Sequence, residues 1–135
     1  MTNNTESKIL RAAADRLSEE RCWTRYVHAR TSIGRYTDPC SKTAVSWCLM
    51  GAILREAPKY RDVYPDKAVD AVCGELKRRG YEVEPYGLSG WNDNPETTHA
   101  DVLSVLRSTI ERLEKKDGRS NPDSQVEQQE DSSQR

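Results

Sequence analysis

Cysteine and histidine are the residues of this 135-residue chain that could carry out covalent chemistry. A cysteine nucleophile needs a base, most often histidine, and a polar group that orients the base. The sequence offers all three types, so a thiol enzyme is one hypothesis. Its candidate nucleophiles are Cys40 and Cys48, its candidate bases His28 and His99, and its candidate orienting groups Asn92 and Asp93.

The two candidate nucleophiles differ in their expected surroundings. Cys48 falls on the apolar stripe of a predicted helix, where burial would raise its pKa and make it unreactive. Cys40 falls in the first turn of the same predicted helix, where the helix dipole would favour the thiolate. No sequence signature of a thiol enzyme surrounds either residue. We therefore favour buried, inert cysteines, and keep the thiol enzyme as the alternative.

Metal and cofactor sites are not indicated. Four cysteines and two histidines could supply zinc ligands, but they form no C-x-x-C or H-x-x-x-H pair and are widely separated. The segment 87–90 (Gly-Leu-Ser-Gly) lacks the spacing and the lysine of a nucleotide-binding loop. The sequence predicts no metal ion and no cofactor.

Residues 21–37 combine basic and aromatic side chains without a single acid. Such a combination suits contact with phosphates and stacking on bases. The alternative is that the aromatic residues fill the core, while the arginines are solvated or pair with acids elsewhere. The arginines are Arg21, Arg25, Arg30 and Arg35, and the rings between them belong to Trp23, Tyr26, His28 and Tyr36.

A second candidate binding site is the predicted loop 85–97, which contains Trp91, Asn92 and Asp93. Asn92 and Asp93 could bind a ligand, or they could satisfy their own backbone in turns that precede a helix. A small-ligand-binding module would have a pocket lined by Trp47, Trp91 and Asn92.

The composition limits the compartment and the partners. Charged residues make up 32% of the chain and the net charge is −1, which argues neither for nor against nucleic acid. No segment approaches the roughly eighteen apolar residues of a membrane span, and no secretory leader is evident. We expect a cytoplasmic protein that does not enter a membrane, with free thiols.

Apolar periodicity predicts a mainly α fold of four helices with a short extended segment or hairpin after the first. The first helix begins near Asn4 or Thr5 and ends near residue 21, and the extended segment follows it. The second begins at Asp38–Pro39 and ends near Ala57. Its stripe is Val45, Cys48, Leu49, Ala52 and Ile53.

Further signals place the later elements. The third predicted helix covers about 66–79 and ends at Gly80, a residue suited to the left-handed stop. A short edge strand is expected at 81–83. The last helix opens with a capping-box-like pair, Thr98 and Asp101. Gly51 lies inside the second helix, where it indicates close approach of another backbone or a large ring, such as that of Trp23 or Trp91.

Two regions of different composition divide the chain. Residues 1–116 form the predicted single helical domain, with a net charge of about +2. Residues 117–135 carry five acids and two arginines and have one aliphatic residue, Val126. Such a tail cannot bury enough apolar surface to offset the entropy of ordering it, so we expect it to be disordered.

The motifs also resemble those of a family of small bacterial and phage proteins that is classed as a domain of unknown function. The matching stretches are 9–15 (Ile-Leu-Arg-Ala-Ala-Ala-Asp), Trp23, the W-C-x-x-G-A motif at 47–52, the W-N-D-x-P motif at 91–95, and Thr98 with Asp101–Val102. The resemblance covers residues 8 to about 110. It implies a compact helical domain and allows a phage or mobile-element origin, and it carries no established activity.

The leading functional hypothesis is a small non-enzymatic binding or accessory protein that contacts a macromolecule. The partner is either a host protein or a nucleic acid. The thiol enzyme and the small-ligand module are the alternatives. The predicted binding residues are Arg21, Arg25, Arg30, Arg35, Trp91, Asn92 and Asp93.

Overall fold

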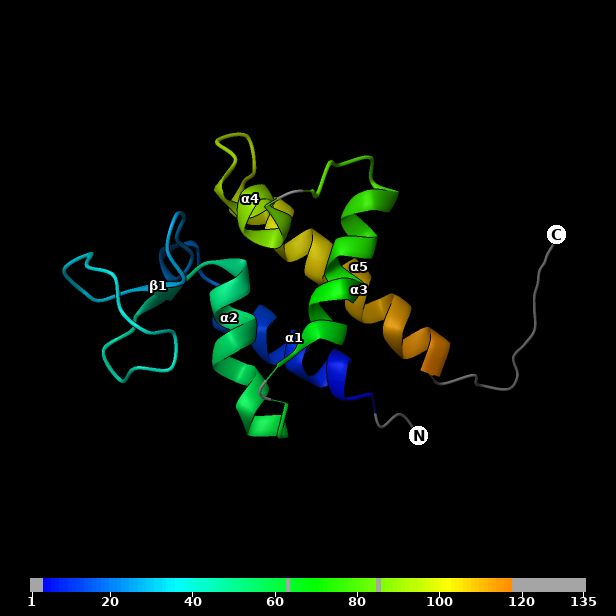
Figure 1. Cartoon of the computed structure of the whole chain (residues 1–135), viewed down its shortest axis with the longest axis horizontal. Helices are drawn as coiled ribbons and strands as arrows, with labels where there is room; N and C mark the ends of the chain where they lie inside the picture. The colour runs from blue at the N-terminus through cyan, green and yellow to red at the C-terminus, as the bar shows by residue number, and fades with distance from the viewer. Residues whose placement is uncertain (1–3, 63, 85, 118–135) are drawn as a thin grey trace, which may run out of the picture.

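The computed structural model describes residues 4–62, 64–84 and 86–117, which fold mainly into helices (Figure 1). This part of the chain contains five α-helices rather than the predicted four, because α4 forms where a loop was expected. After Asp117, the predicted acidic tail lies outside the described residues. The α-helices are α1 (Thr5–Arg16), α2 (Leu49–Glu56), α3 (Asp66–Arg78), α4 (Gly87–Asp93) and α5 (His99–Asp117).

Short elements connect these helices. Two 3₁₀ helices, η1 (Glu20–Cys22) and η2 (Ala57–Tyr60), follow α1 and α2. Strands β1 (Ala29–Arg30) and β2 (Ser46–Trp47) pair antiparallel. A short strand therefore does follow the first helix, but its partner comes from the stretch predicted as the second helix.

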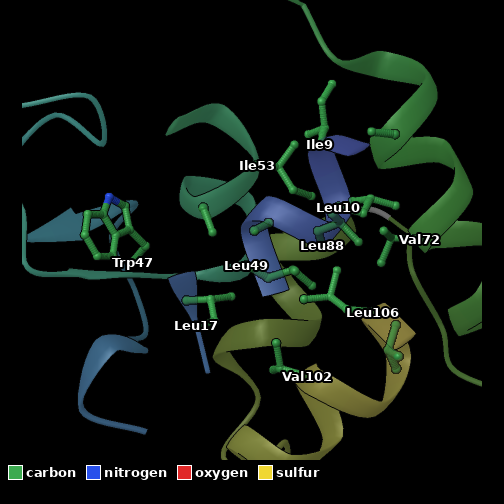
Figure 2. Close-up of a cluster of buried hydrophobic side chains, with 14 of the residues drawn as sticks. Ile9, Leu10, Leu17, Trp47, Leu49, Ile53, Val72, Leu88, Val102 and Leu106 are labelled. Carbon is green, nitrogen blue, oxygen red and sulfur yellow. The ribbon is translucent and has the colours of Figure 1, made fainter. Parts of the chain in front are cut away.

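Helix α1 packs against α2, α3 and α5. Its N-cap is Asn4, as predicted, whose side chain accepts a hydrogen bond of 2.9 Å from the backbone N–H of Ser7. Its apolar stripe, which Leu17 completes just beyond its last turn, is fully buried. Figure 2 shows Ile9 and Leu10 facing Ile53 of α2 and Val72 of α3.

The second helix begins ten residues later than predicted. Residues 39–48 form turns and strand β2, and Val45, predicted to be buried, is 47% exposed. Asp38 does cap a turn, since its carboxylate accepts a hydrogen bond of 2.8 Å from the N–H of Cys40. The segment 43–47 contains β-branched and aromatic residues, which favour strands. Pairing with β1 therefore outweighs the helical period.

Gly51 marks a close contact, as predicted, and the group that approaches is a backbone. A Cβ atom at this position would lie 1.9 Å from the carbonyl oxygen of His28. That carbonyl accepts a hydrogen bond of 3.1 Å from the N–H of Cys48. Glycine thus allows the first turn of α2 to lie directly against the segment that leads into β1.

The predicted helix ends in the second half of the chain are confirmed. Gly80 adopts the left-handed conformation (φ +91°) after α3, and the N–H of Tyr81 donates to the carbonyl of Leu76, as in a Schellman motif. Thr98 and Asp101 each accept a hydrogen bond from the other's backbone N–H, at 3.1 and 3.0 Å. The expected edge strand at 81–83 does not form.

Helix α4 was not predicted because its sequence is rich in glycine and polar residues. Two of its side chains, Leu88 and Trp91, are nevertheless almost completely buried. Tertiary packing thus stabilises a helix that has little intrinsic propensity. Among the described residues, none of the helices is both long and apolar enough to cross a membrane.

Candidate functional site

The segment between η1 and α2, residues 23–48, extends beyond the helices as loops around the small sheet (Figure 1). We call this segment the lobe. Four large apolar side chains of the lobe are exposed, namely Tyr26, Ile33, Tyr36 and Val45. All four predicted arginines lie in the lobe or directly before it.

Asn92 of α4 anchors the lobe to the helical body. Its Oδ1 accepts hydrogen bonds from the indole Nε1–H of Trp23 (2.7 Å) and from the backbone N–H of Leu49 (3.0 Å). Its Nδ2 donates to the carbonyl of Thr24 and to Oδ1 of Asp93, both at 3.1 Å. The side chain is fully buried, so its polar atoms are used inside the protein.

Asp93 holds the next turn of the lobe. Its Oδ1 accepts a hydrogen bond of 2.7 Å from the backbone N–H of Tyr26. Tyr26 adopts a left-handed conformation, with φ at +78°. That conformation costs a residue with a side chain about 1 kcal/mol or more. The carboxylate therefore fixes a strained turn that directs the Tyr26 ring into solvent.

Trp91 lies in the interior with Asn92. Its ring meets that of Tyr81 edge-on, with 5.6 Å between centroids. Its Nε1–H is buried and has no hydrogen-bond acceptor among the described residues. The predicted W-N-D site thus consists of one packed ring and two polar groups that hold the lobe.

The side chains of Arg25 and Arg30 make their hydrogen bonds inside the protein, with groups of the lobe and with Thr97. The Arg25 guanidinium stacks 4.5 Å from the ring centroid of Trp23 and donates to the carbonyl of Thr97. Arg30 donates to Oγ1 of Thr24 at 2.8 Å and to the carbonyls of Gly34 and Arg25 at 2.9 and 3.0 Å. Both side chains therefore brace the loops.

The other two predicted arginines are exposed. Arg21 forms an ion pair of 2.7 Å with Glu19, just before the lobe. The Arg35 side chain has no ion pair or hydrogen bond within the described chain and lies beside exposed Tyr36. Of the four arginines, Arg35 is the one whose guanidinium is free to meet a partner.

A pocket of about 280 Å³ brings together three residues of the thiol-enzyme hypothesis. However, burial raises the pKa of the Cys48 thiol to about 11. Its Sγ caps α2 by accepting a hydrogen bond of 3.2 Å from the N–H of Gly51. At neutral pH the thiol is protonated, which disfavours a nucleophilic role. The pocket is lined by Tyr26, Val27, His28, Tyr36, Cys48, Ser89 and Asp93.

The remaining candidates of that hypothesis lie elsewhere. Cys40 is exposed in a turn before β2, so the expected effect of a helix dipole on its thiol does not apply. His99 is partly buried at the start of α5, where its Nε2 lies 2.6 Å from the carbonyl oxygen of Leu17. Its ring also packs beside that of Trp23.

Trp47 does not share a pocket with Trp91 and Asn92 as the small-ligand hypothesis predicts. It borders a groove that neither Trp91 nor Asn92 lines, and the guanidiniums of Arg16 and Arg55 lie 4.6 and 5.6 Å from its ring centroid. Arg16 also pairs with the buried carboxylate of Glu56. In the described part of the chain, no three His, Cys, Asp or Glu side chains are grouped to hold a metal ion.

Comparison with known proteins identifies the family. A family model described as a family of unknown function (DUF6197) matches residues 1–112. The chain belongs to the DUF6197 family. The match agrees with the resemblance found in the sequence and covers the helical body together with the lobe. No curated protein and no solved structure matches the chain.

A second pocket in this DUF6197 protein was not foreseen from the sequence. It encloses about 290 Å³ and is lined by Trp23, Thr24, Arg25, Tyr26 and Arg30. The sequence did contain a sign of this pocket, because four of its five lining residues, 23–26, are consecutive in the Arg/aromatic segment. What the sequence could not show is that Arg30, from β1, folds back onto them.

Sequence reasoning also missed two exposed aliphatic residues of the lobe, Ile33 and Val45. Ile33 was interpreted as a strand residue and Val45 as a core residue. The signal that could have identified Ile33 is its place between Ser32 and the turn residue Gly34, whereas Val45 fits the helical apolar period and carried no such signal.

Proposed function

We propose that this DUF6197 protein is a non-enzymatic accessory protein that binds another protein through the lobe. The observation that carries the proposal is the gathering of four exposed apolar side chains on one segment that the body holds rigidly. Ile33 is 76% exposed and Tyr26 is 68% exposed. Tyr26 and Tyr36 line one pocket, and exposed apolar residues that lie together mark interaction surfaces more often than scattered ones do.

The residue types favour a protein partner over a nucleic acid. Aliphatic side chains such as Ile33 and Val45 cannot stack on bases, whereas they do bury well in a protein interface. Tyrosine and arginine are enriched in such interfaces, and Arg35 lies beside Tyr36. Arg25 and Arg30 are held at one small pocket by internal hydrogen bonds, so they cannot follow the phosphate backbone of a nucleic acid along the surface.

The charge of the lobe indicates the character of the partner. Between residues 23 and 48 the chain has four basic residues and one acid, Asp38. Of the basic residues, Arg35 and Lys42 are exposed. A partner with an apolar patch bordered by acidic side chains would complement this surface. Action in the cytoplasm, and carriage by a phage or mobile element, form part of this proposal.

The proposal is tested by capture of partners from a lysate of the native host, with the wild-type chain and two surface variants compared side by side. Ile33→Asp places a charge on the most exposed of the four apolar side chains of the lobe, so the bound partner should be lost. Tyr64→Ala is the matched control, because Tyr64 is 81% exposed but lies between η2 and α3, outside the lobe. Bound proteins are identified by mass spectrometry, and a nuclease-treated sample separates protein from nucleic acid.

The expected result is a protein that is retained after nuclease treatment by the wild type and by Tyr64→Ala, and lost by Ile33→Asp. The binding of the purified partner should then weaken at least tenfold in Ile33→Asp. Equal retention by all three chains would exclude the lobe as the interface. Loss of the bound material on nuclease treatment would instead favour a nucleic-acid partner.

A further inference from the structure

We infer that the pocket formed by Trp23, Thr24, Arg25, Tyr26 and Arg30 binds an oxyanion, and that a phosphate monoester is the class of ligand that fits it best. This inference goes beyond the proposed function and does not rest on it. The exposed apolar surface of the lobe could bind a protein whether or not this pocket is filled.

The charge of the pocket is the first observation. Arg25 and Arg30 both line one cavity of about 290 Å³, and the Arg30 guanidinium donates to the carbonyl of Arg25. Neither forms an ion pair with an Asp or Glu of the described chain. Carbonyl and hydroxyl oxygens accept their hydrogen bonds and the Trp23 ring lies against Arg25, but no acidic side chain neutralises either charge. Two uncompensated charges that share one cavity attract an anion.

An unpaired donor is the second observation. Nε of Arg25 is buried and has no hydrogen-bond acceptor in the described part of the chain. Because this nitrogen is closed to solvent, it does not itself contact an anion in the cavity, but its missing acceptor leaves the charge of Arg25 less satisfied. Because Arg25 is also held over the Trp23 ring, its guanidinium is fixed rather than free to turn into solvent. The site is therefore preorganised, which lowers the entropic cost of binding an anion.

The other lining groups fit a phosphate. Oγ1 of Thr24 already accepts from Arg30, so its hydroxyl hydrogen remains available as a donor. None of the residues that line the cavity is an acid. Asp93, which accepts the hydrogen bond from the backbone N–H of Tyr26, lines the neighbouring pocket instead. A phosphate monoester carries between one and two negative charges near neutral pH, which matches two guanidiniums better than one carboxylate does.

The test measures binding of inorganic phosphate to the full chain at pH 7.5, with sodium chloride titrated at equal ionic strength as the reference. The protein has three tryptophans, so the three indole N–H signals of a ¹H–¹⁵N spectrum report on separate places. Phosphate should shift the Trp23 signal saturably, whereas the signals of Trp47 and Trp91 should follow the chloride reference.

Variants assign the binding to the pocket. Arg25→Met and Arg30→Met remove the charge but keep most of the apolar stem, and each should weaken phosphate binding at least tenfold. Arg35→Met is the matched control, because Arg35 belongs to the same segment but not to the pocket, and it should change binding less than twofold. If either pocket variant fails to fold, the site-specific shift of the Trp23 signal in the wild type still decides the question.

Two further ligands identify the source of the phosphate. O-phosphoserine represents a phosphorylated protein and adenosine 5′-monophosphate represents a nucleotide, whose base could stack on exposed Tyr26. Tighter binding of either one than of inorganic phosphate supports the site and names its class. Identical effects of phosphate and chloride would overturn the inference, as would an equal loss of binding in Arg35→Met.

Discussion

The indole nitrogen of Trp23 lies 2.7 Å from Oδ1 of Asn92, a residue 69 positions later in the chain. The same oxygen accepts the N–H of Leu49, the first residue of α2. One buried amide thus joins the start of the lobe, the start of α2 and the end of α4. The lobe is held from within, which leaves its outer side chains free for contact.

We predict that Asn92→Ala destabilises the protein by about 3 kcal/mol, since it leaves several buried polar groups without partners at once. The free energy of unfolding, measured with urea, tests this value. Asn94→Ala is the control, because Asn94 is exposed and its Oδ1 accepts only the local N–H of Glu96. A cost below about 1 kcal/mol for Asn92→Ala would contradict the anchoring role assigned to this side chain.

Gly51→Ala should destabilise the protein by at least about 2 kcal/mol, although alanine favours helices by about 1 kcal/mol over glycine. The added methyl group would overlap the carbonyl oxygen of His28. Gly74→Ala in α3 provides the matched comparison, because the nearest atom to its new Cβ is a flexible Arg78 nitrogen at 3.8 Å. Thermal unfolding should show a lower midpoint for the first variant and an equal or higher midpoint for the second.

Thiol alkylation should separate the cysteines by burial. At pH 7.5, iodoacetamide should modify exposed Cys40 first, whereas Cys48 should react only when the protein unfolds. A pKa of about 11 rather than 9 leaves the Cys48 thiol with about a hundredfold less thiolate than an unperturbed cysteine. Mass spectrometry of digested samples, taken over time with and without denaturant, measures each rate. Rapid modification of Cys48 in the folded protein would revive the thiol-enzyme hypothesis.

The raised pKa of Cys48 also predicts how stability depends on pH. Burial raises that pKa from 9 to about 11, so between these values the unfolded chain loses the proton while the folded chain keeps it. The free energy of unfolding should therefore fall as pH rises from 9 to 11. Cys48→Ser keeps a cap for α2 without a thiol, so its curve should fall less steeply than that of the wild type.

Glu75 should stabilise the contact between α3 and α5. Its buried carboxylate pairs with Arg79, Arg78 and Arg112 at 3.0, 3.4 and 3.5 Å. Burial acts to raise its pKa, but the hydrogen bonds from Arg79 and Arg78 outweigh burial and hold the pKa below its ordinary value.

The lowered pKa of Glu75 determines how its contribution to the free energy of unfolding changes with pH. The contribution of this carboxylate is present above about pH 4.5 and is lost as the pH falls through the lowered pKa. Glu75→Gln should cost about 1 kcal/mol at pH 7, because the arginines are partly exposed and screened. Acid unfolding of this variant should also depend less on pH than that of the wild type. Glu111→Gln is the control: Glu111 is exposed on α5, so this variant should leave the free energy of unfolding at pH 7 unchanged.

Local signals in the sequence were sufficient for the ends of several helices. Asn4, Gly80 and the pair Thr98–Asp101 each act through atoms that lie within five residues, so residue type and spacing define them. The apolar stripe of α1 was equally clear, because an amphipathic helix displays its buried face in its own period.

The errors arose where contacts between distant segments decide the structure. The apolar period from Val45 to Ile53 continues into β2 by coincidence, and only the pairing with β1 shows that Trp47 is extended. Helix α4 looks like a loop until Leu88 and Trp91 are seen to be buried. At the candidate site, the sequence shows that arginines and aromatic residues are close together. It does not show which arginines are held internally, because Arg25 donates to distant Thr97 and the contacts of Arg30 depend on how the lobe folds.

The anchoring of the lobe has a consequence for the order in which the chain acquires its structure. The lobe is synthesised before α4, yet the hydrogen bonds that fix Trp23, Leu49 and Tyr26 all end on Asn92 or Asp93, between 43 and 69 residues later. Contacts so distant in sequence close late, because the entropy of closing the intervening loop must be overcome first. During translation, the surface we assign to partner binding is therefore completed only after α4 has emerged, so a truncated product that ends before Asn92 would lack it.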